Sequence, residues 1–213
     1  MTSRVGRSTL AVVLASLTLA TPVVAQVRVE LGGTIGAYLP QGSFQPAPVG
    51  STLLAASPDQ LSGMALGGQL RVWVARIGVQ LAATTTSSRA GGGSTPEGYF
   101  AAIPARVSTR SAQLLFRLTG DGGRARVWLG AGAGAIRHGG PAYEPFGTPI
   151  NYGGVIGVGS AIRLIAGLSA DLGLTSMIYD LNVRGSAQTD PRISERGRQV
   201  DLLLHTGLSY SWH

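Results

Sequence analysis

Cysteine and lysine are both missing from this chain of 213 residues. Without cysteine the protein has no disulfide framework, and no thiolate is available as a metal ligand. The three histidines, His138, His205 and His213, are dispersed along the sequence and are not spaced as a ligand set. We therefore expect no metal site and no cofactor.

Charged residues are scarce as well. They make up 13% of the chain, whereas about a quarter is usual in a soluble domain. All 17 basic residues are arginine, and the formal net charge is +7. These arginines are scattered and lack the interleaved aromatic residues on which bases stack, which argues against a nucleic-acid partner. Anionic lipid headgroups are the partner class that this charge fits better.

Long apolar runs are absent beyond the N-terminal segment, which excludes a membrane-spanning helix there. At the N-terminus, Arg4 and Arg7 precede a short apolar segment at residues 10–20, and the small-residue site Val23-Val24-Ala25 follows. This order is typical of a cleavable secretory signal, and the apolar segment is too short for an anchor. The sequence thus predicts a signal peptide at residues 1–25 and one domain at residues 26–213.

The C-terminal stretch, residues 199–213, alternates between two faces. Every second residue from Val200 to Trp212 is apolar or Thr, and the residues between them include Asp201, His205 and Ser209. Because side chains alternate across a strand, this is a strand with one apolar wall. Its length approaches what a tilted membrane-spanning strand requires.

The same two-residue period recurs along the whole domain. Turn-rich segments separate the periodic segments, and these connections alternate between long and short. An even number of strands with that rhythm is what an up-and-down membrane barrel requires. We therefore expect an all-β fold, an eight-stranded antiparallel up-and-down transmembrane β-barrel, with strands at residues 27–39, 64–74, 77–87, 107–118, 124–137, 150–162, 166–180 and 199–213.

A soluble eight-stranded barrel is the alternative, because its strands alternate too. In that case the polar face would point to water and would carry many charges of both signs. Here the polar face consists mainly of Gly, Ser, Thr and Gln, which suits a narrow interior. Tyr152, Tyr210 and Trp212 fall near strand ends on the apolar face, where membrane barrels carry aromatic girdles. The pattern therefore favours a membrane barrel.

The signal, the strand pattern and the final aromatic together resemble the small outer-membrane β-barrels of the OmpA/OmpX type and the opacity-like surface proteins. The resemblance implies export to the bacterial outer membrane and contact with outer-membrane lipid, including lipopolysaccharide. It also implies recognition by the outer-membrane assembly machinery through the C-terminal strand, with Leu208, Tyr210 and Trp212 as the assembly signal. His213 is a departure, because it follows the terminal aromatic.

Two motifs invite a catalytic interpretation, and both have a structural one. Gly130, Gly132 and Gly134 share one face of an expected strand, where they make room for interior side chains, since no helix follows as a nucleotide loop would need. Asp201, His205 and Ser209 are the residue types of a catalytic triad, but four residues along a strand span about 13 Å, beyond hydrogen-bond reach. We expect no catalytic residues, with His205 a hydrogen-bonded interior residue and His138 at a loop edge.

Charged residues of inward parity gather at the strand ends nearest the short turns. An interior that side chains fill leaves unpaired arginines costly, so the two acids should pair with them and form a plug of ion pairs. The alternative is that some arginines, Arg126 especially, reach periplasmic water. The expected lumen cluster is Arg28, Glu30, Arg71, Arg117, Arg126 and Asp171.

The last long connection, expected at residues 181–198, carries a second basic group. Guanidinium groups suit phosphate geometry, so this loop could contact lipid phosphate or another ligand, or it could be a solvated connector. The residues concerned are Arg184, Arg192, Arg196 and Arg198.

Barrels of this class serve as adhesins, membrane stabilisers, narrow pores or lipid-modifying enzymes, so fold alone does not decide function. We expect a non-enzymatic surface or structural protein with long extracellular loops, serving adhesion or envelope integrity. A narrow porin-like channel for small solutes is the alternative, and a lipid A-modifying enzyme is a third.

Overall fold

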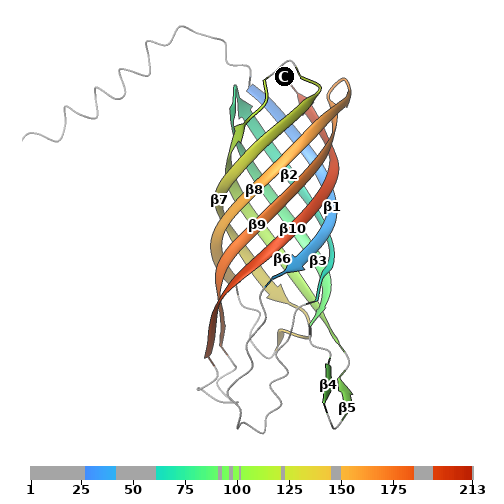
Figure 1. Ribbon diagram of the computed structural model, residues 1–213, viewed down its shortest axis with the longest axis vertical. Coiled ribbons are helices and arrows are strands. Elements are labelled where there is room, and N and C mark those ends of the chain that lie inside the picture. Colours follow the sequence, from blue (N-terminus) through green and yellow to red (C-terminus); the bar gives the residue numbers. More distant parts are fainter. Residues whose placement is uncertain are drawn as a thin grey trace, which may run out of the picture.

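Eight long antiparallel strands close into a single barrel in the computed structural model (Figure 1). The structure describes residues 27–41, 61–90, 93–95, 98–100, 102–120, 123–144, 150–184 and 194–212. The predicted fold class, an eight-stranded antiparallel barrel, is confirmed. The barrel strands are β1 (Val27–Pro40), β2 (Gly63–Val74), β3 (Ile77–Ala90), β6 (Ile103–Arg117), β7 (Ala125–Gly139), β8 (Ile150–Ile165), β9 (Leu168–Arg184) and β10 (Ser194–Trp212).

Consecutive barrel strands are neighbours, and β1 pairs with β10 to close the sheet. In this closing ladder Leu31 lies opposite Tyr210 and Ala37 lies opposite Leu204. A two-stranded hairpin, β4 (Gly93–Thr95) and β5 (Gly98–Phe100), lies beyond the barrel in the connection between β3 and β6 (Figure 1). The sequence pattern gave no sign of this hairpin. No helix among the described residues is long and apolar enough to cross a membrane.

Several strands are longer than the sequence predicts, and one turn was placed wrongly. The pattern put a turn at residues 163–165, but β8 continues to Ile165 with an irregular register after Arg163. The chain reverses at Ala166 and Gly167, because Gly167 has a φ of +76°, which a residue without Cβ adopts freely. The connection expected at residues 181–198 is also too long, since β9 extends to Arg184 and β10 begins at Ser194.

The two faces of the barrel differ as their period predicts. Outward apolar side chains are widely exposed, for example Leu114 at 62% and Leu208 at 54%, whereas the inward Arg71 and Glu30 are only 1% and 2% exposed. An apolar outer surface around a charged interior is the reverse of a soluble barrel and is what a lipid environment requires. The soluble-barrel alternative is therefore wrong, and the strands are transmembrane strands.

Aromatic side chains mark both edges of the apolar outer surface. Tyr210 and Trp212 lie beside the short turns, with ring centroids 5.1 Å apart, and both are 47% exposed. Tyr152 lies near the other end of the barrel and is 76% exposed. We call these ends the short-turn end and the long-loop end. In membrane barrels the short turns face the periplasm, and aromatic girdles sit at both interfaces.

Arginine at Leu208, which points outward on β10 four residues above Trp212 and so about 10 Å from the short-turn edge of the belt, should destabilise the folded barrel by about 2–4 kcal/mol, because the charge would lie near the bilayer midplane. Arginine at Val200, outward on the same strand but near the long-loop end, should cost much less. Urea unfolding in lipid vesicles, followed by the heat-modifiable shift on an SDS gel, measures both. Equal losses would show that the apolar belt is misplaced.

Candidate functional site: the lumen

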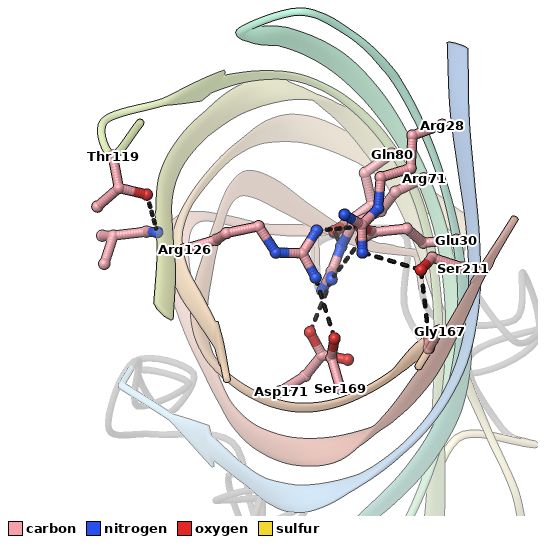
Figure 2. Close-up of polar contacts among 11 residues, drawn as sticks. Arg28, Glu30, Arg71, Gln80, Thr119, Arg126, Gly167, Ser169, Asp171 and Ser211 are labelled. Atoms are coloured by element: carbon pink, nitrogen blue, oxygen red, sulfur yellow. Dashed lines mark hydrogen bonds and ion pairs between the residues drawn. The ribbon is translucent and has the colours of Figure 1, made fainter. Parts of the chain in front are cut away.

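Glu30 is the centre of an ion-pair cluster inside the barrel at the short-turn end (Figure 2). Its Oε1 accepts a charge-assisted hydrogen bond from Nη1 of Arg126, which reaches across the lumen from β7. Arg28 Nε lies 2.9 Å from the same oxygen, and Arg71 Nη1 lies 3.6 Å from Oε2. One carboxylate on β1 is therefore shared by three guanidinium groups from three strands.

Arg71 joins this centre to the opposite wall. Its Nη1 donates to Asp171 Oδ1 on β9 at 2.8 Å, and its Nε donates to Gln80 Oε1 on β3 at 2.7 Å. Arg126 makes a similar link, because its Nη2 donates to Ser169 Oγ at 3.1 Å. The network thus spans the lumen in two directions, and its hydrogen bonds satisfy charges that burial would otherwise make costly.

Two tryptophans complete this layer. Trp73 and Trp128 meet edge to face with centroids 6.2 Å apart. The Arg71 guanidinium lies 4.3 Å from the Trp128 ring centroid, and that of Arg117 lies 4.8 Å from the Trp73 centroid. Cation–π contacts of this kind stabilise buried guanidinium groups that exceed the available carboxylates. Here that excess is two, because four arginines share the layer with two acids.

The tryptophans depend on glycine in the neighbouring strands. A Cβ on Gly78 would lie 2.6 Å from Trp73 Cε3, and one on Gly159 would lie 2.6 Å from Trp128 Cε2. Gly130 has the role expected for it, because its Cβ would meet Leu115 Cδ2 at 2.7 Å and Gln113 Oε1 at 2.8 Å. These three glycines therefore make room for large interior side chains, whereas a Cβ on Gly132 would first meet the backbone of Ala112 and Gln113.

All six residues of the expected lumen cluster lie in this one layer, which we call the ion-pair plug. Arg126 is 3% exposed, so it lies inside the barrel rather than in open water. Arg28 is nearest the rim, with an 11% exposed side chain, and donates to Ser211 Oγ at 2.9 Å. The plug consists of Arg28, Glu30, Arg71, Arg117, Arg126 and Asp171.

A second closed layer, near the long-loop end, was not expected from the sequence. Asp201 Oδ2 accepts hydrogen bonds from the hydroxyls of Tyr38, at 2.6 Å, and Tyr179, at 2.8 Å. The Tyr179 hydroxyl also lies 3.3 Å from His138 Nε2, and the His138 ring packs on Tyr143 at 5.0 Å between centroids. We call these five residues the upper cap. Four of them point inward near the long-loop ends of β1, β7, β9 and β10, and Tyr143 lies in the segment after β7. That these side chains meet is visible only once the register is known.

The upper cap corrects one expectation and gives Asp201 a structural role. His138 does not lie at a loop edge: it is in β7 and is 1% exposed, because β7 extends to Gly139. Asp201 binds two tyrosine hydroxyls on its Oδ2, which is an arrangement that holds strands together rather than one that activates a nucleophile. Apolar side chains fill the rest of this layer, among them Val107, Ile136, Val155 and Met177.

Between the two layers lies a cavity of about 50 Å³. Since one water needs ~10–15 Å³ of such space, the cavity has room for a few water molecules. Most of its exposed wall is apolar, with Val155 and Met177 among the lining residues, and amides, hydroxyls and the half-buried imidazole of His205 lie between them. Besides Tyr38 and Asp201 of the upper cap, the polar lining residues are Thr34, Gln69, Gln80, Thr84, Thr109, Ser111, Gln113, Thr175 and His205. Within the described part of the chain, no three His, Asp or Glu residues are grouped as metal ligands would be.

The structure does not assemble the expected loop arginines into one site. Arg184 belongs to β9, and Arg196 and Arg198 belong to β10, so the loop itself is shorter than the pattern indicated. Arg198 is exposed and lies 3.9 Å from the exposed Asp180. Arg192 lies outside the described residues, as does the expected signal peptide at residues 1–25. The expected assembly residues Leu208, Tyr210 and Trp212 all lie on the outer face.

Glu30→Gln should lower the free energy of unfolding by about 3–5 kcal/mol, because it leaves three guanidinium groups without their shared charge. Asp171→Asn should cost less, since Arg71 is the one ion-pair partner of Asp171 among the described residues. The control is Asp180→Asn, whose exposed pair with Arg198 should leave stability unchanged. Urea unfolding in vesicles ranks the three variants, and an order other than this one would contradict the central role of Glu30.

Comparison with known proteins supplies the fold and no family. No family model matches the chain, and no curated protein matches it. The structure of outer membrane protein OprG from Pseudomonas aeruginosa is similar, with 13% identity, a TM-score of 0.64, and coverage of 87% of this chain and 96% of that chain. Outer membrane protein AlkL is similar at 14% identity and a TM-score of 0.56, over 87% and 89% of the two chains. The chain therefore has the fold of the small eight-stranded outer-membrane barrels.

Proposed function

We propose that this protein is a sealed outer-membrane barrel with a structural or surface role and no enzymatic activity. The observation that carries the proposal is the pair of closed layers in the lumen, the ion-pair plug near the short-turn end and the upper cap near the long-loop end. An ion entering from the short-turn end would have to separate Arg126 from Glu30 and Arg71 from Asp171. Breaking buried pairs costs several kcal/mol each, so the ground state does not conduct.

The proposed location and partners follow from the same structure. The apolar belt with its aromatic edges suits a bilayer, and residues 1–25 have the order of an export signal. Outer-membrane lipid and lipopolysaccharide are then the immediate surroundings, and the assembly machinery is an obligatory partner during insertion. Adhesion or envelope integrity would depend on the long loops.

A narrow channel for small solutes is the second candidate, and the cavity between the layers, which several polar side chains line, favours it. The cavity already provides hydrogen-bond partners for water, so a channel would need only that the plug and the cap open. The lipid A-modifying enzyme has less support, since Asp201 is committed to Tyr38 and Tyr179 and lies inside the barrel.

Labelling of a single cysteine separates the sealed barrel from the channel, because the chain has no native cysteine to interfere. Thr109→Cys places a thiol in the cavity wall. In the sealed state it should resist a charged, water-soluble maleimide, and the protein should show no steady conductance in a planar bilayer. Adding Glu30→Ala and Asp171→Ala should make the thiol reactive from the short-turn side.

Ser87→Cys is the positive control, because Ser87 points outward near the long-loop end and is exposed. It should react in every background. Rapid labelling of Thr109→Cys in an otherwise unchanged barrel, together with stable conductance, would overturn the sealed barrel and establish the channel.

Trp212→Ala should slow membrane insertion while leaving the folded barrel nearly as stable, since Trp212 is half exposed at the rim and lies outside both closed layers. Pulse–chase appearance of the heat-modifiable band measures the rate. Leu164→Ala, an outward rim residue of β8, is the matched control and should insert at the normal rate. Equal rates for all three proteins would contradict an assembly role for the C-terminal aromatic.

A further inference from the structure

Three arginines gather on the outer face of the barrel, away from the lumen. Arg106 and Arg110 lie on β6, where they face Gly139 and Ala135 of β7. Arg137 of β7 faces Ser108, which lies between them on β6. Diagonal neighbours on one face of a sheet are about 7–8 Å apart, so three guanidinium groups can converge on one small anion. We call Arg106, Arg110 and Arg137 the arginine patch.

The patch carries positive charge that the described residues leave unbalanced. All three arginines are exposed, and no ion pair joins any of them to a described carboxylate. Their neighbours on this face are hydroxyl side chains, Thr85 and Ser108, whose oxygens lie 3.4 Å apart. Guanidinium groups interleaved with hydroxyls are a donor set suited to phosphate oxygens.

The height of the patch matches the edge of the apolar belt. Going from the short turn, the outward residues are Leu118, directly after β6, and then Phe116, Leu114 and Ala112 of β6, and Arg110 comes next. With a tilted rise of roughly 2.5 Å per residue, Arg110 lies about 20 Å above Leu118, close to the top of a belt about 25 Å tall. Tyr152 lies on the same rung, opposite Ala135. The patch therefore begins where lipid headgroups begin.

A shallow groove runs across the outer surface directly below the patch, and Arg110 forms part of its wall. Its floor consists of small side chains, which leave the sheet surface lower than the leucines on the neighbouring strands. The floor residues are Gly68, Ala83, Ala112, Ala133 and Ala135, and the walls include Leu31, Leu70, Leu81 and Tyr152. An open apolar groove next to a cluster of exposed guanidinium groups has the shape and chemistry of an acyl-chain site.

We propose that the outer face of β3, β6 and β7 binds a phosphorylated glycolipid of the outer leaflet. A phosphate lies among Arg106, Arg110 and Arg137, and one acyl chain occupies the groove that Ala112 and Ala133 floor. The proposal rests on the outer-membrane location proposed above. It concerns the outside of the barrel and needs neither the sealed lumen nor the arginines near the β9–β10 loop.

The first test uses the protein in phosphatidylcholine nanodiscs and titrates bisphosphorylated hexa-acyl lipid A, with bound lipid counted by native mass spectrometry. Replacing Arg106, Arg110 and Arg137 together by Gln should weaken binding about tenfold or more, and high salt should have a similar effect on the unchanged protein. The matched control replaces Arg76, Arg124 and Arg163, exposed at the short-turn end, and should bind as the unchanged protein does. Equal binding by both triple variants would overturn the site.

The ligand's chemistry is tested on the same sample. Dephosphorylated lipid A should bind about as weakly to the unchanged protein as lipid A does to the patch variant. Phosphatidylglycerol should displace lipid A poorly, because it offers a single phosphodiester. Tight binding of the dephosphorylated lipid would contradict phosphate recognition by the arginine patch. Equal displacement by phosphatidylglycerol would contradict selectivity for a glycolipid.

A double substitution tests the role of the groove. Ala112→Leu with Ala133→Leu fills the floor and should also weaken lipid A binding, while Ala37→Leu with Ala170→Leu, outward alanines outside the groove, should not. All these variants should keep the Thr109→Cys thiol protected, since none lies in the lumen. A loss of lipid binding with a protected thiol supports the site, and normal binding by the filled groove contradicts it. If the lumen proves unsealed, the lipid-binding measurements still stand, and the heat-modifiable shift on an SDS gel replaces thiol protection as the check that the variants are folded.

Discussion

Closure of the sheet between β1 and β10 is the constraint on which the rest of this structure depends. A bilayer offers no hydrogen bonds to an open edge, so every strand must have two neighbours. Once eight strands close, the interior is only wide enough for side chains. The ion-pair plug, the two tryptophans and the inward glycines are the consequence, because buried charges in an interior of this width must find their partners among other side chains. Glu30 is the main partner, as it is shared by Arg28, Arg71 and Arg126.

The lumen and the outer face solve the same electrostatic problem differently. Inside, guanidinium groups are held by two carboxylates, by hydroxyls and by tryptophan rings, so their charges are largely met within the protein. On the outside, Arg106, Arg110 and Arg137 have no carboxylate partner among the described residues. Two groups of arginines in one chain thus have different surroundings: the plug arginines have partners inside the barrel, and the arginine patch is the group that we propose to meet lipid phosphate.

Strand number, parity and the faces of the barrel could be predicted because a two-residue period fixes which side chains share a face. That is how Glu30, Asp171 and four arginines could be placed together before any register was known. The upper cap could not be predicted, since Tyr38, His138 and Asp201 meet only through the stagger of the strands. The strand ends were predicted wrongly for a local reason: polar residues such as Arg196 and Arg198 are typical of a loop, although β10 already begins at Ser194.

The separation of the plug residues along the chain has a consequence for folding. Arg126 and Glu30 are 96 residues apart, and Arg71 and Asp171 are 100 apart. Neither contact can stabilise a partly inserted sheet, because each joins walls that face each other only in the closed barrel. Interactions absent from the transition state slow unfolding without speeding folding. The plug therefore acts as a kinetic latch: it contributes little to the rate of insertion and much to the lifetime of the barrel once β10 has met β1.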